Sequence, residues 1–172
     1  MTPAKEGDHF DRAVPPLTRT DAYIAAALSE SDGRRVDLQS LIHDFDWLNR
    51  DIPTFDQLSY GIPRLMANGY VDVYRNSRGG LRFAATESTR ALRKSISTDS
   101  LGMIVIDMAR LVGAAPWPEP EIEDLSLGRL PDLTATDVEV AYRKHARWVE
   151  HWSKPLVALS RVVMWWINRR VR

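Results

Sequence analysis

The sequence predicts a mainly α-helical protein with one small β-sheet. Three segments between residues 20 and 69 repeat apolar residues at the spacing of an amphipathic helix, and a capping residue precedes each of them. Two runs of β-forming residues, 70–74 and 81–85, flank a turn rich in glycine. A long repeat of helical period follows between residues 138 and 166. Helices therefore account for most of the predicted structure, and one hairpin supplies the strands.

The composition is typical of a folded globular protein. Apolar residues make up 44% and charged residues 27% of the 172 residues. The chain has no cysteine, which excludes disulfides, thiol nucleophiles and zinc sites with cysteine ligands; this is compatible with the cytoplasm, where we expect the protein. Residues 1–16 are polar and lack the apolar core of a signal peptide, so we expect a flexible N-terminal arm.

The first two helices are predicted from caps and apolar spacing. Thr20 is a suitable N-cap for a first helix, which Asp32-Gly33 ends. The short piece 34–36 can form an edge strand, and Asp37 can cap a second helix. The buried face of that second helix is predicted to consist of Leu38, Leu41, Ile42, Phe45 and Leu48.

The third helix has the clearest start signal. Thr54 and Gln57 match the capping box, in which two side chains satisfy free N–H groups of the first turn. Asn68-Gly69 can end this helix in a left-handed cap, and Pro63 should bend it. The hairpin over 70–85 follows, and Thr86 can cap a further helix.

The order helix, short strand, helix, helix, hairpin, helix resembles a winged helix-turn-helix domain. The segment Leu65-Met66-Ala67-Asn68-Gly69-Tyr70-Val71 and the following hairpin are similar to the way MarR and PadR regulators of bacteria leave their recognition helix and build the wing. We therefore assign residues 17–97 to a winged-helix domain. The resemblance implies DNA binding by the third helix and the wing, and homodimerisation through appended helices.

Residues 98–172 are predicted to form a helical extension. It comprises a buried helix at about 100–113, a proline-rich linker over 114–134 and a long helix over 136–170 that Pro155 kinks or divides. Thr136 and Glu139 match a capping box at the start of the long helix. Apolar and aromatic residues then alternate spacings of four and three, as in a helix-packing seam. The seam residues are Val138, Tyr142, His145, Val149, Trp152, Leu156, Leu159, Val163 and Trp166.

The seam admits three interpretations. We expect a homodimer, with tryptophans as anchors of the interface. Packing of the seam onto the winged domain of the same chain is the second interpretation. Contact with a membrane is the third and the weakest, suggested by tryptophans and arginines that occur together near the C-terminus.

Charge is unevenly distributed, although 23 Lys and Arg balance 23 Asp and Glu. Residues 36–74 carry six acids and two arginines, whereas residues 75–94 carry six basic residues and one glutamate. The wing and the helix after it therefore carry the positive charge that binds phosphates. The candidate phosphate-binding residues are Arg75, Arg78, Arg82, Arg90, Arg93 and Lys94. The candidate base-reading residues of the third helix are Gln57, Tyr60, Arg64 and Asn68.

The sequence thus favours a DNA-binding protein, either a transcriptional regulator or an accessory factor. The acidic second helix favours an alternative, a winged helix that binds a protein partner and has no affinity for DNA. An enzyme is not expected, because the glycine-rich phosphate loops and the strained serine turn of known catalytic motifs are absent. The cluster His43-Asp44-Phe45-Asp46 is better explained as a solvated helix face than as a metal site. We expect no metal or cofactor.

Overall fold

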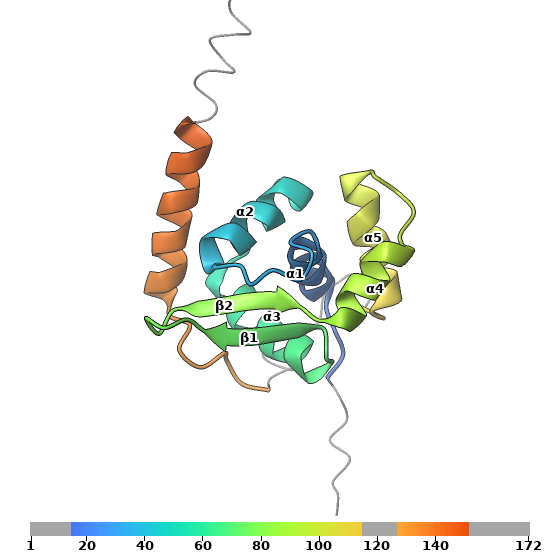
Figure 1. Ribbon diagram of the computed structural model, residues 1–172, viewed down its shortest axis with the longest axis horizontal. Helices are drawn as coiled ribbons and strands as arrows, with labels where there is room; N and C mark the ends of the chain where they lie inside the picture. The colour runs from blue at the N-terminus through green and yellow to red at the C-terminus, as the bar shows by residue number, and fades with distance from the viewer. Residues whose placement is uncertain (1–14, 115–126, 152–172) are drawn as a thin grey trace, which may run out of the picture.

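The computed structural model describes residues 15–114 and 127–151 (Figure 1). Its helices are α1 (Arg19–Ser29), α2 (Leu38–Asn49), α3 (Phe55–Ala67), α4 (Glu87–Ser95) and α5 (Leu101–Leu111), followed by a C-terminal helix whose described part is 135–151. The strands β1 (Val71–Arg75) and β2 (Leu81–Ala85) form one antiparallel hairpin. The prediction of a mainly helical protein with one small sheet is confirmed.

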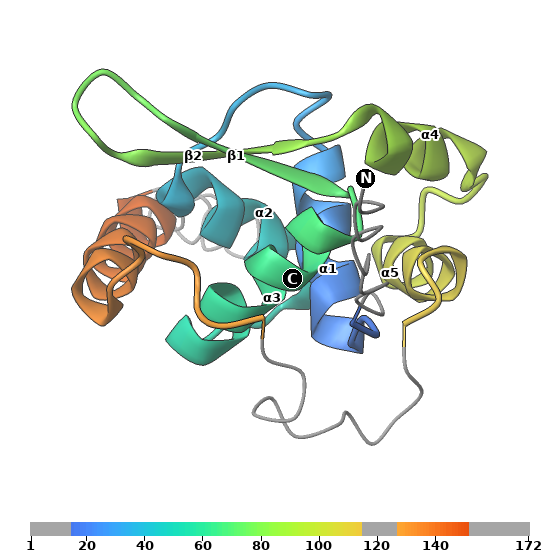
Figure 2. The same ribbon diagram turned by 90° about the horizontal axis from the view of Figure 1, so that it is seen from below.

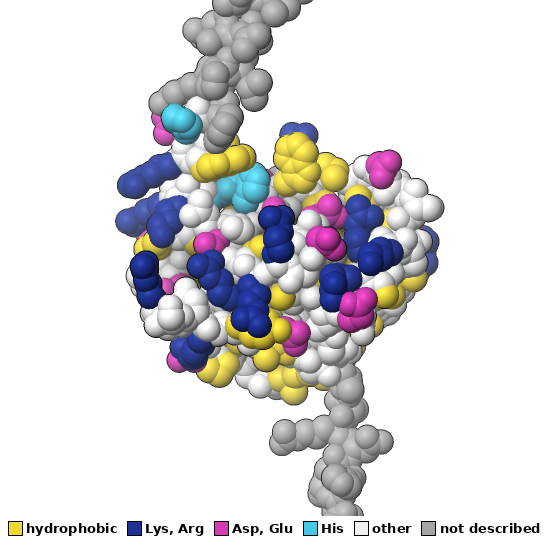
Figure 3. All heavy atoms as spheres, viewed as in Figure 1, with side chains coloured by type: hydrophobic (Ala, Val, Ile, Leu, Met, Phe, Trp, Pro, Cys, Tyr) yellow, Lys and Arg dark blue, Asp and Glu magenta, His cyan; other side chains and the backbone are white. Residues whose placement is uncertain are grey.

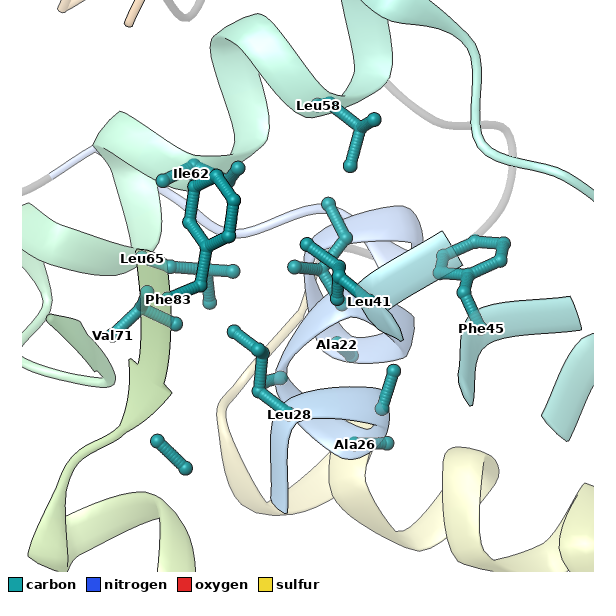
Figure 4. Packing of buried hydrophobic residues seen from close by; sticks show 14 of the residues in the cluster. Ala22, Ala26, Leu28, Leu41, Phe45, Leu58, Ile62, Leu65, Val71 and Phe83 are labelled. Atoms are coloured by element: carbon teal, nitrogen blue, oxygen red, sulfur yellow. The ribbon is translucent and has the colours of Figure 1, made fainter. Parts of the chain in front are cut away.

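Helix α1 lies at the centre of the protein. It packs against α2, α3, α4, α5 and β2. Leu28 of α1, Leu41 of α2 and Phe83 of β2 are each fully buried and converge in the core (Figure 4). The C-terminal helix stands beside α2, and α5 lies at the opposite end of the molecule (Figures 1 and 2).

The helix caps follow local sequence rules, with two corrections. Asp37 caps α2 by accepting from the Ser40 N–H at 2.9 Å, and Thr54 with Gln57 forms the predicted capping box of α3. Helix α1 is capped by Thr18, because the Asp21 carboxylate closes a box with it; the predicted cap, Thr20, lies inside the first turn.

The C-terminal helix also starts earlier than predicted. Thr134 and Asp137 form its capping box, in which each side chain accepts from the other residue's backbone N–H at 3.1 and 3.0 Å. The prediction of Thr136 and Glu139 was therefore wrong by two residues. The predicted pair has the usual Glu at the fourth position, whereas the box that forms has Asp137 there, just as the box of α1 has Asp21.

Backbone hydrogen bonds join the hairpin to the segments on both of its sides. Gly69, with φ of +72°, ends α3 in the predicted left-handed cap, and the Tyr70 N–H then donates to the Leu65 carbonyl at 2.9 Å. On the other side of the sheet, Val36 and Phe83 exchange two backbone hydrogen bonds of 2.8 and 2.9 Å. The edge strand predicted at 34–36 is thus a single bridge.

Helix α5 is buried on one side only. Ile104, Val105 and Met108 face the core, while Met103 and Ile106 are exposed. The prediction of a buried helix at 100–113 therefore holds for one face. Among the described residues, no helix is both long and apolar enough to cross a bilayer. Most of the predicted N-terminal arm and of the proline-rich linker lies outside the described residues.

Candidate nucleic-acid interface

The hairpin turn presents one of the predicted phosphate-binding residues. The Asn76 side-chain oxygen accepts from the backbone N–H groups of Arg78 and Gly80, both at 2.9 Å, and Gly79 adopts a φ of +82° that favours glycine. These bonds stabilise the turn, because the Asn76 side chain accepts from two N–H groups that no backbone carbonyl accepts from. Arg78 is exposed at its tip.

Four of the other predicted phosphate-binding residues are paired with carboxylates. Arg75 pairs with Asp132, Arg82 with Asp37 at 2.9 Å, Arg90 with Glu87, and Arg93 with Glu30 at 2.6 Å. Arg78 and Lys94 have no ion pair within the part of the chain that the structure describes. Pairs at a protein surface contribute only about 0–1 kcal/mol each, so a phosphate can replace such a carboxylate.

Arg64, predicted to read bases from α3, is instead part of the core. Its Nε and one of its terminal nitrogens donate to the two oxygens of Asp21 at 2.7 and 2.8 Å, and its side chain is 2% exposed. Gly61 allows this approach, since a Cβ there would lie 2.6 Å from the Asp21 carboxylate. Burial raises the pKa of Asp21, although hydrogen bonds from Arg64 and Thr18 act to lower it. The prediction for Arg64 was wrong because its partner lies on another helix.

The other three predicted reading residues of α3 are engaged within the chain. Gln57 accepts from the Thr54 N–H in the capping box at 2.7 Å, and the Tyr60 hydroxyl accepts from Arg129 Nε at 2.8 Å. The Asn68 side-chain amide donates to the carbonyls of Arg64 and Pro15 at 2.9 and 3.2 Å. Each of the three side chains therefore already makes a hydrogen bond within the chain.

A segment that we term the strap, residues 127–133, lies over the first two turns of α3. Pro63 has no N–H, so the Ser59 carbonyl loses its partner within the helix and accepts instead from the Leu130 N–H at 2.7 Å. The Arg129 guanidinium lies 5.4 and 5.1 Å from the ring centres of Phe55 and Tyr60. It also pairs with Asp56 at 3.2 Å. The strap thus covers the end of α3 that a recognition helix uses to approach bases.

A second set of cations surrounds the N-terminus of α2. Arg34 and Arg35 are exposed in the loop before this helix, and Lys144 reaches the same region from the C-terminal helix. With Arg78 and Arg82 of the hairpin they form what we term the basic face: Arg34, Arg35, Arg78, Arg82 and Lys144. Figure 3 shows lysine and arginine side chains spread across this side of the protein, with carboxylates between them.

The basic face contains a cavity of about 460 Å³ between the loop before α2, the first turns of α2, β2 and the C-terminal helix. Ser31, Arg34, Arg35, Val36, Asp37, Gln39, Ser40, His43, Asp44, Arg82, His145 and Trp148 line it. His145 Nε2 lies 3.1 Å from an Asp46 oxygen, and the His43 ring meets the Trp148 ring edge-on at 4.2 Å. Burial raises the pKa of Asp44, which accepts a hydrogen bond from the Ser31 hydroxyl at 3.3 Å.

The chain matches no protein family, no curated protein and no solved structure.

The predicted seam of the C-terminal helix divides into three parts. Val138 and His145 are buried within the chain, and the Tyr142 hydroxyl donates to the Pro53 carbonyl, so these three side chains pack against the α2–α3 region. Val149 is 40% exposed. The remaining seam residues, Trp152, Leu156, Leu159, Val163 and Trp166, lie outside the described residues. At its start, the seam thus has the intramolecular role that was the second interpretation.

Sequence reasoning missed Arg34, Arg35, Lys144 and Arg129. The adjacent arginines just before the Asp37 cap were a readable signal, because the first turn of a helix also attracts anions. Lys144 carried no such signal, since only the packing of the C-terminal helix brings it to the N-terminus of α2. Arg129 was likewise hidden, because its contacts depend on the carbonyl that Pro63 leaves free.

Proposed function

We propose that the chain is a winged helix-turn-helix protein that binds duplex DNA through phosphate contacts from its basic face. The order of elements supports the fold: α1, a bridge at Val36, α2, α3, a hairpin and α4. In this assignment α3 stands in the place of a recognition helix and the hairpin is the wing. DNA binding then belongs to the wing and the N-terminus of α2.

One observation carries the proposal. The exposed cations Arg34, Arg35, Arg78 and Lys144 lie around the wing and the α2 N-terminus, while the strap covers the first turns of α3. Phosphate contacts position a protein on DNA but carry no sequence information, whereas base contacts supply specificity. The expected activity is therefore DNA binding with little sequence preference, as in an accessory factor.

Fluorescence anisotropy with labelled duplexes tests this proposal. Four cations in contact with phosphates predict a slope of about −4 in a plot of log K against log salt. Two duplexes of unrelated sequence should bind with similar affinity. No binding even at low salt, about 50 mM, where phosphate contacts are strongest, overturns the proposal.

Charge variants make the test specific. Arg78→Ala and Lys144→Ala should each make the salt slope less negative by about 0.9, because each removes one phosphate contact. Arg110→Ala is the matched control. Arg110 is an exposed arginine of α5 that pairs with Asp107 of its own helix, at the far end of the protein from the C-terminal helix (Figure 2). An equal effect of all three variants contradicts a contact through the basic face.

A protein-binding winged helix without DNA affinity is the second candidate. The ion pairs of Arg75, Arg82, Arg90 and Arg93 favour it, because they neutralise much of the charge that DNA would require. If the anisotropy changes with neither duplex, this candidate is favoured over the first. The protein used must also unfold cooperatively, which shows that it is folded.

A further inference from the structure

Two chemically different sets of side chains line the cavity in the basic face. Its volume of about 460 Å³ falls in the range of small-molecule sites, which is roughly 300–1,000 Å³. Arg34 and Arg35 come from the loop before α2, and Arg82 comes from β2. The second set, His43, His145 and Trp148, comes from α2 and the C-terminal helix. A ligand that fills the cavity should therefore combine an anionic group with a planar ring.

The arginines of the cavity have donors to spare. Arg34 uses its Nε to hold the Ser31 carbonyl at 3.1 Å, which leaves its terminal nitrogens for a ligand. The guanidinium carbon of Arg35 lies 3.8 Å from the centre of the Tyr74 ring, and this cation–π contact uses none of its N–H donors. The first turn of α2, which also lines the cavity, adds the positive end of a helix. This combination suits a phosphate group.

The two carboxylates of the cavity wall have hydrogen-bond partners. Asp37 caps α2 and pairs with Arg82 at 2.9 Å, and Asp44 accepts from the Ser31 hydroxyl. Because Arg82 is paired with Asp37, Arg34 and Arg35 face the cavity against the one remaining carboxylate, that of Asp44. An anion is favoured over a cation or a purely apolar molecule.

The aromatic side chains of the cavity supply ring surfaces. The His145 ring lines the cavity but is only 3% exposed, and its Nδ1 is covered by protein atoms. Trp148 is 43% exposed and offers a ring surface beside His43. A nucleobase supplies a planar ring that can lie against this surface.

We propose that this cavity binds a nucleoside monophosphate, with the phosphate at Arg34 and Arg35 and the base beside Trp148 and His145. The proposal is independent of DNA binding, because it concerns a small molecule inside the cavity. A strand of DNA and a free nucleotide share the phosphate ester, so the experiment separates these two sources.

Isothermal titration calorimetry on the full chain tests the proposal. The probes are AMP, GMP, CMP and UMP, with adenosine and inorganic phosphate as the two halves of one ligand. At least one nucleotide should bind, and adenosine and inorganic phosphate should each bind at least about tenfold more weakly, since each lacks one end of the match. No heat with any of the four nucleotides at millimolar concentration overturns the proposal. Binding of inorganic phosphate as tight as that of the best nucleotide also overturns it.

Variants locate the ligand. The double variant Arg34→Ala/Arg35→Ala should weaken nucleotide binding at least about tenfold, because it removes charge-assisted hydrogen bonds to the phosphate. Trp148→Leu should weaken binding of the nucleotide but leave that of inorganic phosphate unchanged. Arg110→Ala is the control and should change neither. Unchanged nucleotide affinity in the double variant, with an unchanged unfolding curve, refutes this location.

Parallel anisotropy with duplex DNA keeps the two proposals separable. Duplex binding without nucleotide binding refutes only the cavity proposal, and nucleotide binding without duplex binding refutes only the DNA proposal. The variants also differ, because Arg78 and Lys144 do not line this cavity.

Discussion

Arg64 of α3 and Asp21 of α1 form a two-bonded ion pair in the centre of the protein, although 43 residues separate them in the chain. The pair joins the helix that the sequence suggested as a DNA reader to the central helix of the core. Its burial explains why Arg64 contributes to stability and not to an exposed surface.

Loss of Arg64 should destabilise the protein strongly. Arg64→Met leaves the Asp21 carboxylate buried without its partner, and breaking such a pair costs about 3–5 kcal/mol. Adding Asp21→Asn should recover part of the loss, because it removes the unpaired charge. Urea unfolding measures both. A cost for Arg64→Met no larger than that of the exposed Arg110→Met contradicts the prediction.

The Arg64→Met variant should also respond to pH. Burial raises the pKa of Asp21 in the folded protein, so the ionised form opposes folding at a pH above that folded pKa. The opposition disappears as the pH falls and the carboxyl becomes protonated. The stability deficit of the variant should therefore shrink as the solution is acidified, as measured by urea unfolding at a series of pH values.

Asp37 should give the opposite pH dependence. Burial acts to raise its pKa, but the hydrogen bonds from Ser40 and the Arg82 guanidinium outweigh this and hold it below the ordinary 3.8. The stabilisation is thus complete above the unfolded pKa and is lost as the pH falls through the lower folded pKa. Asp37→Ser keeps a capping oxygen but removes the charge, so its stability difference from the wild type should vanish in acid. Asp37→Ala removes the cap as well and should cost about 1 kcal/mol more.

Restoring the missing N–H of α3 should loosen the strap. In Pro63→Ala, the new N–H can donate to the Ser59 carbonyl, which now accepts from Leu130. Amide hydrogen exchange at Leu130 should become faster, while exchange in β1 stays unchanged as the internal control. Unaltered protection of the Leu130 amide would show that the other strap contacts suffice to hold it.

The predicted homodimer can be tested on the described part of the seam. We expect light scattering to give about twice the 19.6 kDa of one chain. Val149→Lys should shift the protein toward the monomer, because Val149 continues the seam and is 40% exposed. Val140→Lys is the matched control, since Val140 is 43% exposed on the same helix but outside the seam. A monomer in the wild type refutes the prediction.

Local features were predictable from the sequence. The caps at Asp37 and Thr54 and the glycine end of α3 depend on residues within one turn of each other, so their pattern specifies them. The hairpin is equally local. At the start of the C-terminal helix two possible capping pairs overlap, and the pair predicted from the sequence was the wrong one.

Long-range relationships were not predictable. The exposed side of α3 looked suited to base reading because Arg64 is polar, but the fit of Asp21 against Gly61 buries it. The seam of the C-terminal helix correctly indicated a face that packs. The same spacing of apolar residues is expected whether that face packs against another chain or against α2 of its own chain. Such choices depend on the tertiary arrangement, which periodicity does not encode.

The strap connects two surfaces that have been treated separately so far. Asp132 of the strap pairs with Arg75 of the hairpin, so a polyanion that takes Arg75 weakens the hold of the strap on α3. Thermodynamic linkage makes this reciprocal: a partner that displaces the strap frees Arg75 and raises the affinity of the hairpin for phosphate. A surface pair worth about 0.5 kcal/mol sets the coupling at roughly a factor of two. Such a coupling shifts the affinity of the hairpin and of α3 for their partners only slightly, and it is too small to act alone as a switch.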